Sequence, residues 1–275
     1  MYTVLLASSV VGITGILIGV LLGIASEYFA VEVDEKEILV REALPGNNCG
    51  GCGFPGCDGL AKAIALGEAS VDSCPVGGSV VAKNIAKIMG VSVTETVKKV
   101  AYVRCAGTCQ KTKEKYVYFG VKDCNQMKAV PGFGSKSCQY GCMGYGSCVK
   151  ACKFDAIHIV DGIALVDKEK CTACGKCITA CPKNLIELVP YNQRYLVQCY
   201  SQDKGKEVKE KCTAGCIGCT MCTKVCQDDA IHMNGNVAQI DYEKCINCGK
   251  CAAKCPVKVI EGLLKNTEKQ SHEVA

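Results

Sequence analysis

The amino-acid sequence predicts an α+β protein with an N-terminal transmembrane helix, a small helical module and two tandem cysteine-rich units. Three observations lead to this prediction. The first 26 residues carry no charge, 25 of the 275 residues are cysteine, and a pattern of six cysteines occurs twice at a fixed spacing. The uncharged start and the repeat divide the chain into an anchor, a first module and two repeated units.

The uncharged start predicts a membrane anchor at residues 1–26. The run Thr3–Ala25 is long enough, as a helix, to cross about 30 Å of hydrocarbon. A cleaved signal peptide is the alternative, but the basic n-region is absent and Ile24-Ala25-Ser26 is a poor cleavage site. We therefore expect a retained single-pass helix, followed by an acidic linker at residues 27–45.

The cysteine content favours a metal protein over a disulfide scaffold. Most cysteines stand in C-x-x-C-x-x-C runs, and side chains that close cannot all pair with distant partners at good disulfide geometry. The chain has no Trp and only five Phe, so its soluble part has few large side chains for a core. We expect bound metal to supply folding free energy as well as function.

The chain repeats itself with an offset of 74 residues. Pro182 recurs as Pro256 at this offset. The six repeated cysteines are Cys148, Cys152, Cys171, Cys174, Cys177 and Cys181, which recur as Cys222, Cys226, Cys245, Cys248, Cys251 and Cys255. A gap-free repeat of this length indicates two equivalent structural units. We place unit 1 at residues 137–196, unit 2 at 197–263 and a polar tail at 264–275.

Each unit contains the run C-x2-C-x2-C-x3-C-P, which is typical of bacterial [4Fe-4S] proteins. Three thiolates at i, i+3 and i+6 reach three corners of one cubane, and the fourth cysteine ligates the neighbouring cluster. Gly175 and Gly249 let the backbone approach the cluster, and the proline ends the loop. Zinc sites use two C-x-x-C pairs instead of this triple.

Each unit resembles a two-cluster bacterial ferredoxin on these cysteine runs. The resemblance implies that the two runs of a unit exchange their fourth cysteine. The implied ligand sets are Cys216, Cys219, Cys222 and Cys255, then Cys226, Cys245, Cys248 and Cys251, and in unit 1 Cys152, Cys171, Cys174 and Cys177.

The remaining cluster of unit 1 departs from the ferredoxin pattern. Tyr145 stands where unit 2 has Cys219, so one ligand of the run is missing. Cys138 and Cys142 lie upstream and can replace it. The most economical set is Cys138, Cys142, Cys148 and Cys181.

The first module, residues 46–100, contains a fifth candidate site. Its cysteines follow the pattern Cys49-x2-Cys52-x4-Cys57-x16-Cys74 in a Gly-rich loop. We predict helices over Asp58–Glu68 and Val80–Met89, so that three thiolates of the loop and one beyond a helix close around a cubane. A zinc site is the alternative. The motif resembles the small iron–sulfur domain of certain electron-transfer subunits and corrinoid proteins.

Five cysteines are left without a site: Cys105, Cys109, Cys124, Cys199 and Cys212. Cys105, Cys109 and Cys124 could support a sixth cluster if Cys138, Cys199 or Cys212 supplies a fourth ligand. Reduced, buried thiols are an equally good interpretation. The sequence therefore predicts five [4Fe-4S] clusters and leaves a sixth open.

Residues 101–136 form a basic connecting region. Tyr102-Val103 and Tyr116–Phe119 have the apolar character of strands. Five lysines form a candidate docking surface for an acidic partner: Lys111, Lys113, Lys115, Lys122 and Lys128. A [4Fe-4S]2+ core with four thiolates carries about −2, so five clusters change the formal +5 to about −5, which argues against nucleic-acid binding.

The order of anchor, four-cysteine module, basic region and two ferredoxin-like units resembles the B subunit of Rnf complexes over essentially the whole chain. The resemblance implies a cytoplasmic-membrane subunit, with its clusters on the cytoplasmic side, of an ion-translocating ferredoxin:NAD+ oxidoreductase. Soluble ferredoxin would be the electron donor, and flavin-bearing and membrane subunits would be partners. No nucleophile–base constellation is present, so we expect no catalytic residue. Alternatives are an electron-transfer subunit of another membrane enzyme, or an iron–sulfur sensor or storage protein.

Overall fold

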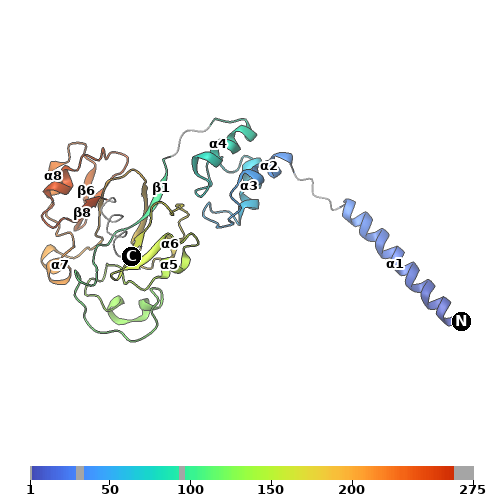
Figure 1. The fold of residues 1–275 in the computed structure, drawn as a ribbon, viewed down its shortest axis with the longest axis horizontal. Coiled ribbons are helices and arrows are strands. Elements are labelled where there is room, and N and C mark those ends of the chain that lie inside the picture. The colour runs from blue at the N-terminus through green and yellow to red at the C-terminus, as the bar shows by residue number, and fades with distance from the viewer. Residues whose placement is uncertain (1, 29–33, 93–96, 263–275) are drawn as a thin grey trace, which may run out of the picture.

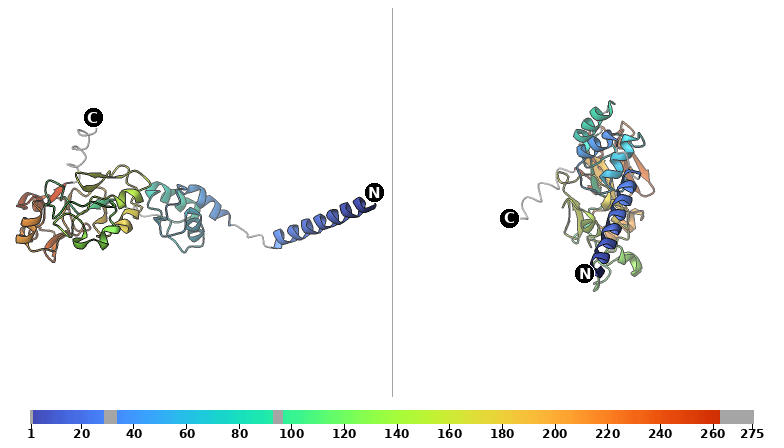
Figure 2. Two further views of the ribbon diagram at one scale, coloured as in Figure 1. Left: turned by 90° about the horizontal axis from the view of Figure 1, so that it is seen from below. Right: turned by 90° about the vertical axis from the view of Figure 1, so that its right-hand side faces the viewer.

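The computed structural model describes residues 2–28, 34–92 and 97–262. Helix α1 (Tyr2–Tyr28) is long and stands away from the rest of the chain in Figures 1 and 2. Large apolar side chains along it, such as Ile16 and Leu22, are exposed. In the part of the chain whose side chains are described, which leaves out residues 3–11 of this helix, no helix is long and apolar enough to cross a membrane.

The first module is a bundle of three helices: α2 (Glu35–Ala43), α3 (Cys57–Ala65) and α4 (Gly78–Met89). The predicted helices at 58–68 and 80–89 correspond to α3 and α4. Helix α2 lies where the sequence predicts an acidic linker. Its first turn is capped by the Asp34 side chain, and it buries Val40 completely against Leu60 and Ile64 of α3. An N-cap and one apolar stripe therefore make a helix of this acidic segment.

The rest of the chain consists of short helices and two-stranded antiparallel sheets, and its segments lie together in Figure 1. In unit 1, the hairpin of β2 (Ile157–Val160) and β3 (Ile163–Val166) turns through Asp161-Gly162, both with left-handed backbone. In unit 2, β6 (Ile231–Asn234) and β7 (Val237–Ile240) form the hairpin at the same offset of 74, so the sequence repeat is a structural repeat.

A second sheet in each unit joins strands that are far apart in sequence. Strand β1 (Lys99–Val103) pairs with β4 (Ile186–Pro190), and β5 (Tyr195–Val197) pairs with β8 (Ile260–Gly262). Strand β1 thus belongs to the sheet of unit 1, although the sequence pattern assigns residues 101–103 to a separate basic region. Likewise, β5 belongs with unit 2, although the repeat boundary assigns residues 195 and 196 to the end of unit 1.

The short helices carry cysteines toward the cores. They are α5 (Ser147–Ala151), α6 (Lys176–Ala180), α8 (Met221–Val225) and α9 (Lys250–Lys254); α7 (Gly205–Lys211) and the 3-10 turns η1 (Gln126–Ala129) and η2 (Pro131–Phe133) lie in the connecting loops. Residues 116–119 form no strand, contrary to the sequence prediction. Val117 and Phe119 are 71% and 90% exposed, so no neighbouring strand or core holds them.

Candidate iron–sulfur centres

Eight cysteines of unit 2 line two cavities in sets of four. One cavity is lined by Cys226, Cys245, Cys248 and Cys251, and the other by Cys216, Cys219, Cys222 and Cys255. These are the sets that the ferredoxin resemblance implies. Apolar side chains, including Ile231 and Val259, form most of the other walls. Each cavity therefore combines four thiols with an apolar lining, an environment that suits a thiolate-bound cluster.

Backbone geometry explains how each cysteine run orients its sulfur atoms. The residue before each of the four short helices has left-handed backbone: Gly146, Gly175 and Gly249 have φ near +76°, and Thr220 has φ of 58°. This conformation reverses the chain between the second and third cysteine of a run. The fourth cysteine then accepts a hydrogen bond at Sγ from the backbone N–H four residues later. These bonds are Ala156 to Cys152, Leu185 to Cys181, Ala230 to Cys226 and Val259 to Cys255, at 3.3–3.4 Å.

In unit 1, the thiols of Cys152, Cys171, Cys174 and Cys177 are close enough to influence one another. Burial raises the pKa of Cys177 to about 12, and the charges of the other three add to the shift. The N–H of Ala101 in β1 donates to Cys171 Sγ at 3.3 Å. A thiol with a raised pKa remains protonated until metal displaces its proton, so assembly of this site is coupled to proton release.

In the structure, the thiols that lie together at the remaining site of unit 1 differ from the predicted set. A cavity is lined by Cys124, Cys142, Cys148 and Cys181, with Cys124 in the place that sequence spacing assigns to Cys138. Burial raises the pKa of Cys148 to about 12, and Cys142, Cys124 and Cys181 are among the neighbours that raise it further. Ser147 Oγ accepts a bond from the N–H of Cys124 at 2.9 Å and so holds that loop against α5. The structure therefore places Cys124 at this cavity, where the economical choice by sequence distance has Cys138.

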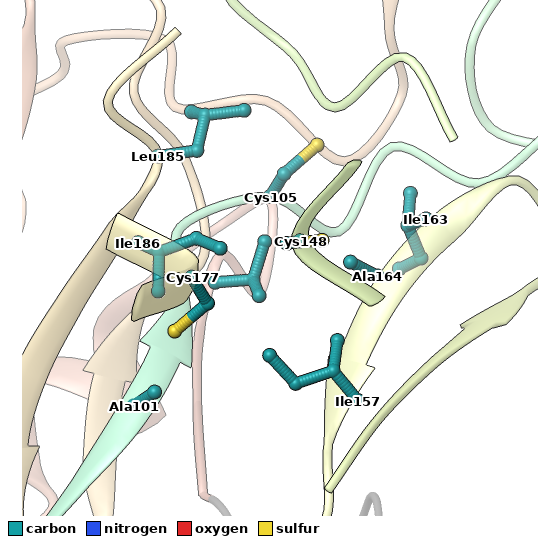
Figure 3. Close-up of a cluster of buried hydrophobic side chains, with 10 residues drawn as sticks. Ala101, Cys105, Cys148, Ile157, Ile163, Ala164, Cys177, Leu185 and Ile186 are labelled. Carbon is teal, nitrogen blue, oxygen red and sulfur yellow. The ribbon is translucent and has the colours of Figure 1, made fainter. Parts of the chain in front are cut away.

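Cys138 lies instead on a different cavity, together with Cys105, Cys199 and Cys212. Sequence proximity groups Cys105 with Cys109 and Cys124 as candidates for a sixth cluster, and the structure separates these three. Cys124 lies with Cys142, and Cys109 is exposed beside the Asp161-Gly162 turn, where its N–H donates to the Asp161 carbonyl. Figure 3 shows the sulfur atoms of Cys105 and Cys177 directed to opposite sides of the core of unit 1.

The first module packs three of its four cysteines into or against its helical core. Cys57 and Cys74 are buried with Leu60 and Ile64, and Cys52 packs against the same core. Burial is the largest cause of a raised pKa at Cys74, and the neighbouring Cys52 and Cys57 add to it. Asn48 Oδ1 accepts a bond from the Cys57 N–H at 2.7 Å and so fixes the loop that carries Cys49 and Cys52. Among the described residues, no group of three or more His, Cys, Asp or Glu side chains is placed to hold a single metal ion. This finding includes every cysteine set described above.

Comparisons with known proteins fit this geometry. An Fe-S cluster family model (FeS) matches residues 44–76, a "4Fe-4S binding domain" model matches residues 164–187, and a "4Fe-4S dicluster domain" model matches residues 215–259. Together they cover the Cys49–Cys74 loop, the Cys171–Cys181 run and the cysteines from Cys216 to Cys255. The chain thus contains several iron–sulfur domains.

Three relatives match nearly the full chain. The B subunit of the Na(+)-translocating ferredoxin:NAD(+) oxidoreductase complex of Acetobacterium woodii is 48% identical over 94% of this chain and 78% of that protein. The B subunit of the ion-translocating oxidoreductase complex of Methanosarcina acetivorans is 44% identical, over 90% and 94% respectively. The B subunit of the proton-translocating ferredoxin:NAD(+) oxidoreductase complex of Clostridium ljungdahlii is 38% identical, over 98% and 96%. The chain belongs to the family of Rnf-complex B subunits.

Proteins of this family are the iron–sulfur electron-transfer subunits of such oxidoreductase complexes, and the cavities described above are where this chain gathers its thiols. The two segments between the matched models, residues 77–163 and 188–214, contain nine cysteines. Four of them line one cavity: Cys105, Cys138, Cys199 and Cys212. Three others, Cys124, Cys142 and Cys148, line the cavity of unit 1 that also contains Cys181. Sequence spacing alone contains no direct signal for the site that joins Cys105 to Cys199, because its ligands come from separate segments.

Proposed function

We propose that this Rnf-type subunit takes low-potential electrons from reduced soluble ferredoxin and passes them, one at a time, through its clusters to flavin-bearing partner subunits. The observation that carries the proposal is that cysteines line three separate cavities of units 1 and 2 in sets of four. Three cysteines of the first module also pack together in its core. A [4Fe-4S] cluster supplies a one-electron couple whose potential depends on charge, hydrogen bonds to sulfur and solvent exposure. The chain itself holds the clusters and presents docking surfaces.

We assign five cluster sites within this function. The proposed ligand sets are Cys49, Cys52, Cys57 and Cys74; Cys152, Cys171, Cys174 and Cys177; Cys124, Cys142, Cys148 and Cys181; Cys216, Cys219, Cys222 and Cys255; and Cys226, Cys245, Cys248 and Cys251. Three cavities and the mutual influence of neighbouring thiols support these sets.

Helix α1 is proposed as the anchor of the protein in the cytoplasmic membrane, with the clusters on the cytoplasmic side. It contains no charged residue before Glu27, and its described apolar side chains are exposed. When the protein is expressed without partner subunits, the full-length chain should remain in carbonate-washed membranes. A variant lacking residues 1–28 should instead be found in the supernatant. A truncated chain that stays in the membrane fraction contradicts the anchor.

The docking surface for ferredoxin is proposed at the lysines of the basic region. Lys111, Lys113, Lys115 and Lys122 are exposed, and the side chain of Lys128 lies outside the described residues. Lys111 and Lys113 flank Thr112, which is buried and donates through Oγ1 to Cys212 Sγ at 3.5 Å. An acidic donor bound to these lysines would therefore lie next to a cysteine-lined cavity. The exposed Val117 and Phe119 of the same segment add an apolar contact.

The double variant Lys111→Glu/Lys113→Glu tests this surface. Reversing both charges should slow reduction of the holoprotein by ferredoxin about tenfold at low ionic strength, because electrostatic steering is lost, and should weaken its dependence on salt. Stopped-flow spectroscopy at several salt concentrations measures both effects. Lys62→Glu/Lys87→Glu changes the net charge equally on exposed faces of α3 and α4 and serves as the control. Equal rates in the two double variants would count against the proposed surface.

A further inference from the structure

The cavity lined by Cys105, Cys138, Cys199 and Cys212 lies outside all three matched family segments. We propose that these four cysteines bind a sixth [4Fe-4S] cluster, which joins unit 1 to unit 2. The inference rests on the proposed electron-transfer function and deepens it. It also accounts for the cysteine content, because six sets of four use all of the 25 cysteines except the exposed Cys109.

The two units contribute to this cavity in equivalent ways. Cys105 follows β1, which pairs with β4 of unit 1, and Cys199 follows β5, which pairs with β8 of unit 2. Cys138 and Cys212 are 74 residues apart, and each stands four positions before the first cysteine of its unit's run. Each unit therefore supplies one thiol from a strand end and one from a loop. The resulting four thiols are the number that a [4Fe-4S] cluster takes.

Two of the four cysteines at this cavity are buried, and their sulfurs accept backbone hydrogen bonds as sulfurs at the ferredoxin-type sites do. Cys105 and Cys199 are 9% and 7% exposed. Cys105 Sγ accepts from the N–H of Gly107 at 3.4 Å, and Cys199 Sγ accepts from the N–H of Ser201 at 3.4 Å. Such bonds stabilise the negative charge of cluster-bound thiolates. The empty space here, its open mouth included, is about 450 Å³, which is comparable to about 380 and 320 Å³ at the two cavities of unit 2.

A buried cation beside the cavity points to an anionic occupant. Lys136 is 8% exposed and lines the cavity. Its Nζ donates to the carbonyls of Gly107 at 2.9 Å and Gly162 at 2.7 Å, and it makes no ion pair with any described residue. A buried ammonium group without a counter-charge is strongly unfavourable. The net negative charge of a thiolate-bound [4Fe-4S] cluster would supply that counter-charge, whereas four neutral thiols would not.

Backbone hydrogen bonds connect this cavity to a neighbouring set on each side. The N–H of Cys142, which belongs to the Cys124 set of unit 1, donates to Cys105 Sγ at 3.3 Å. The N–H of Cys216, which belongs to unit 2, donates to the Cys199 sulfur. The proposed cluster would accept one electron from a reduced neighbour, changing from 2+ to 1+, and return to 2+ by passing that electron to the oxidised neighbour. No bond to a substrate is formed or broken.

The double variant Cys105→Ser/Cys199→Ser tests the proposal, because it removes one ligand contributed by each unit. The full-length wild-type holoprotein, purified without oxygen, should contain about 24 irons and an equal amount of acid-labile sulfide. The double variant should contain about 20 irons and lose one spin from the integrated EPR signal of the fully reduced protein. Cys109→Ser is the matched control and should retain the wild-type values.

A wild-type count of about 20 irons that is unchanged in the double variant would overturn the sixth cluster and leave the proposed function intact. One zinc per chain that disappears in the double variant would also overturn it. Wild-type protein without iron or sulfide would refute the proposed function itself. If the double variant does not accumulate, the wild-type iron and zinc content decides between these outcomes.

Discussion

Removal of the clusters from the full-length chain is expected to abolish the folded structure of units 1 and 2. Thiols occupy places in their cores: Cys105, Cys148 and Cys177 are buried with Ile157 and Leu185 in one of them. The sheets have two strands each, with three to five residues per strand, and an isolated pair of that size is at best marginally stable. A domain has only about 5–15 kcal/mol of net stability, so loss of several metal-binding terms exceeds it.

Far-UV circular dichroism during heating measures this effect. The clusters would be removed by oxidation in the presence of a chelator, and the thiols then reduced again so that no disulfide holds the chain. The stripped protein should show no cooperative transition, whereas protein exposed to the chelator without oxidant should unfold as the untreated holoprotein does. If the stripped chain unfolds at the same temperature as the holoprotein, apolar packing alone is sufficient to fold units 1 and 2.

Substitution of Gly51 by Leu is expected to weaken the electronic contact between the first module and unit 1. Gly51 lies between Cys49 and Cys52, and a Cβ at this position would meet the Cys174 carbonyl oxygen at 2.7 Å and the Cys174 Cα at 3.0 Å. Because the obstacle is backbone, the two loops must move apart to admit a side chain. These loops carry ligands of two proposed clusters, so the distance between the clusters should increase.

Gly51→Leu should keep the wild-type iron content, since the core of α2, α3 and α4 is untouched. Rapid-freeze EPR after mixing with a limiting amount of reduced ferredoxin should show slower redistribution of electrons to the first module. Magnetic broadening between the two signals should also decrease. Gly53→Leu is the control: it has a strained φ of +88°, but its Cβ would meet no atom within 4 Å. Electron redistribution as fast as in wild type would contradict a route through Gly51 and Cys174.

Local sequence spacing predicted the parts of the site that local backbone geometry determines. The triple C-x-x-C-x-x-C places its sulfurs through one loop and one helical turn, so the sets of unit 2 could be assigned from the resemblance without a structure. The helices α3 and α4 were predictable for the same reason, because their apolar stripes are local.

Apart from helix α2, the features that sequence reasoning missed depend on contacts between distant segments. Strand β1 pairs with β4, more than 80 residues later, so its place in unit 1 has no local signal. Cys105 and Cys199 are 94 residues apart and meet only because each follows an equivalent strand end. Val117 and Phe119 have the composition of a strand, but a strand needs a partner, and the structure provides none for these residues.

Thiolates of this chain are proposed to hold a connected series of iron–sulfur cubanes. Mössbauer spectroscopy of the full-length protein, enriched in the active iron isotope and prepared without oxygen, tests this proposal most directly. We predict that nearly all iron shows the [4Fe-4S]2+ signature, with sulfide and iron in equal amounts. Iron present as isolated tetrahedral ions without sulfide, or zinc in its place, would contradict the account.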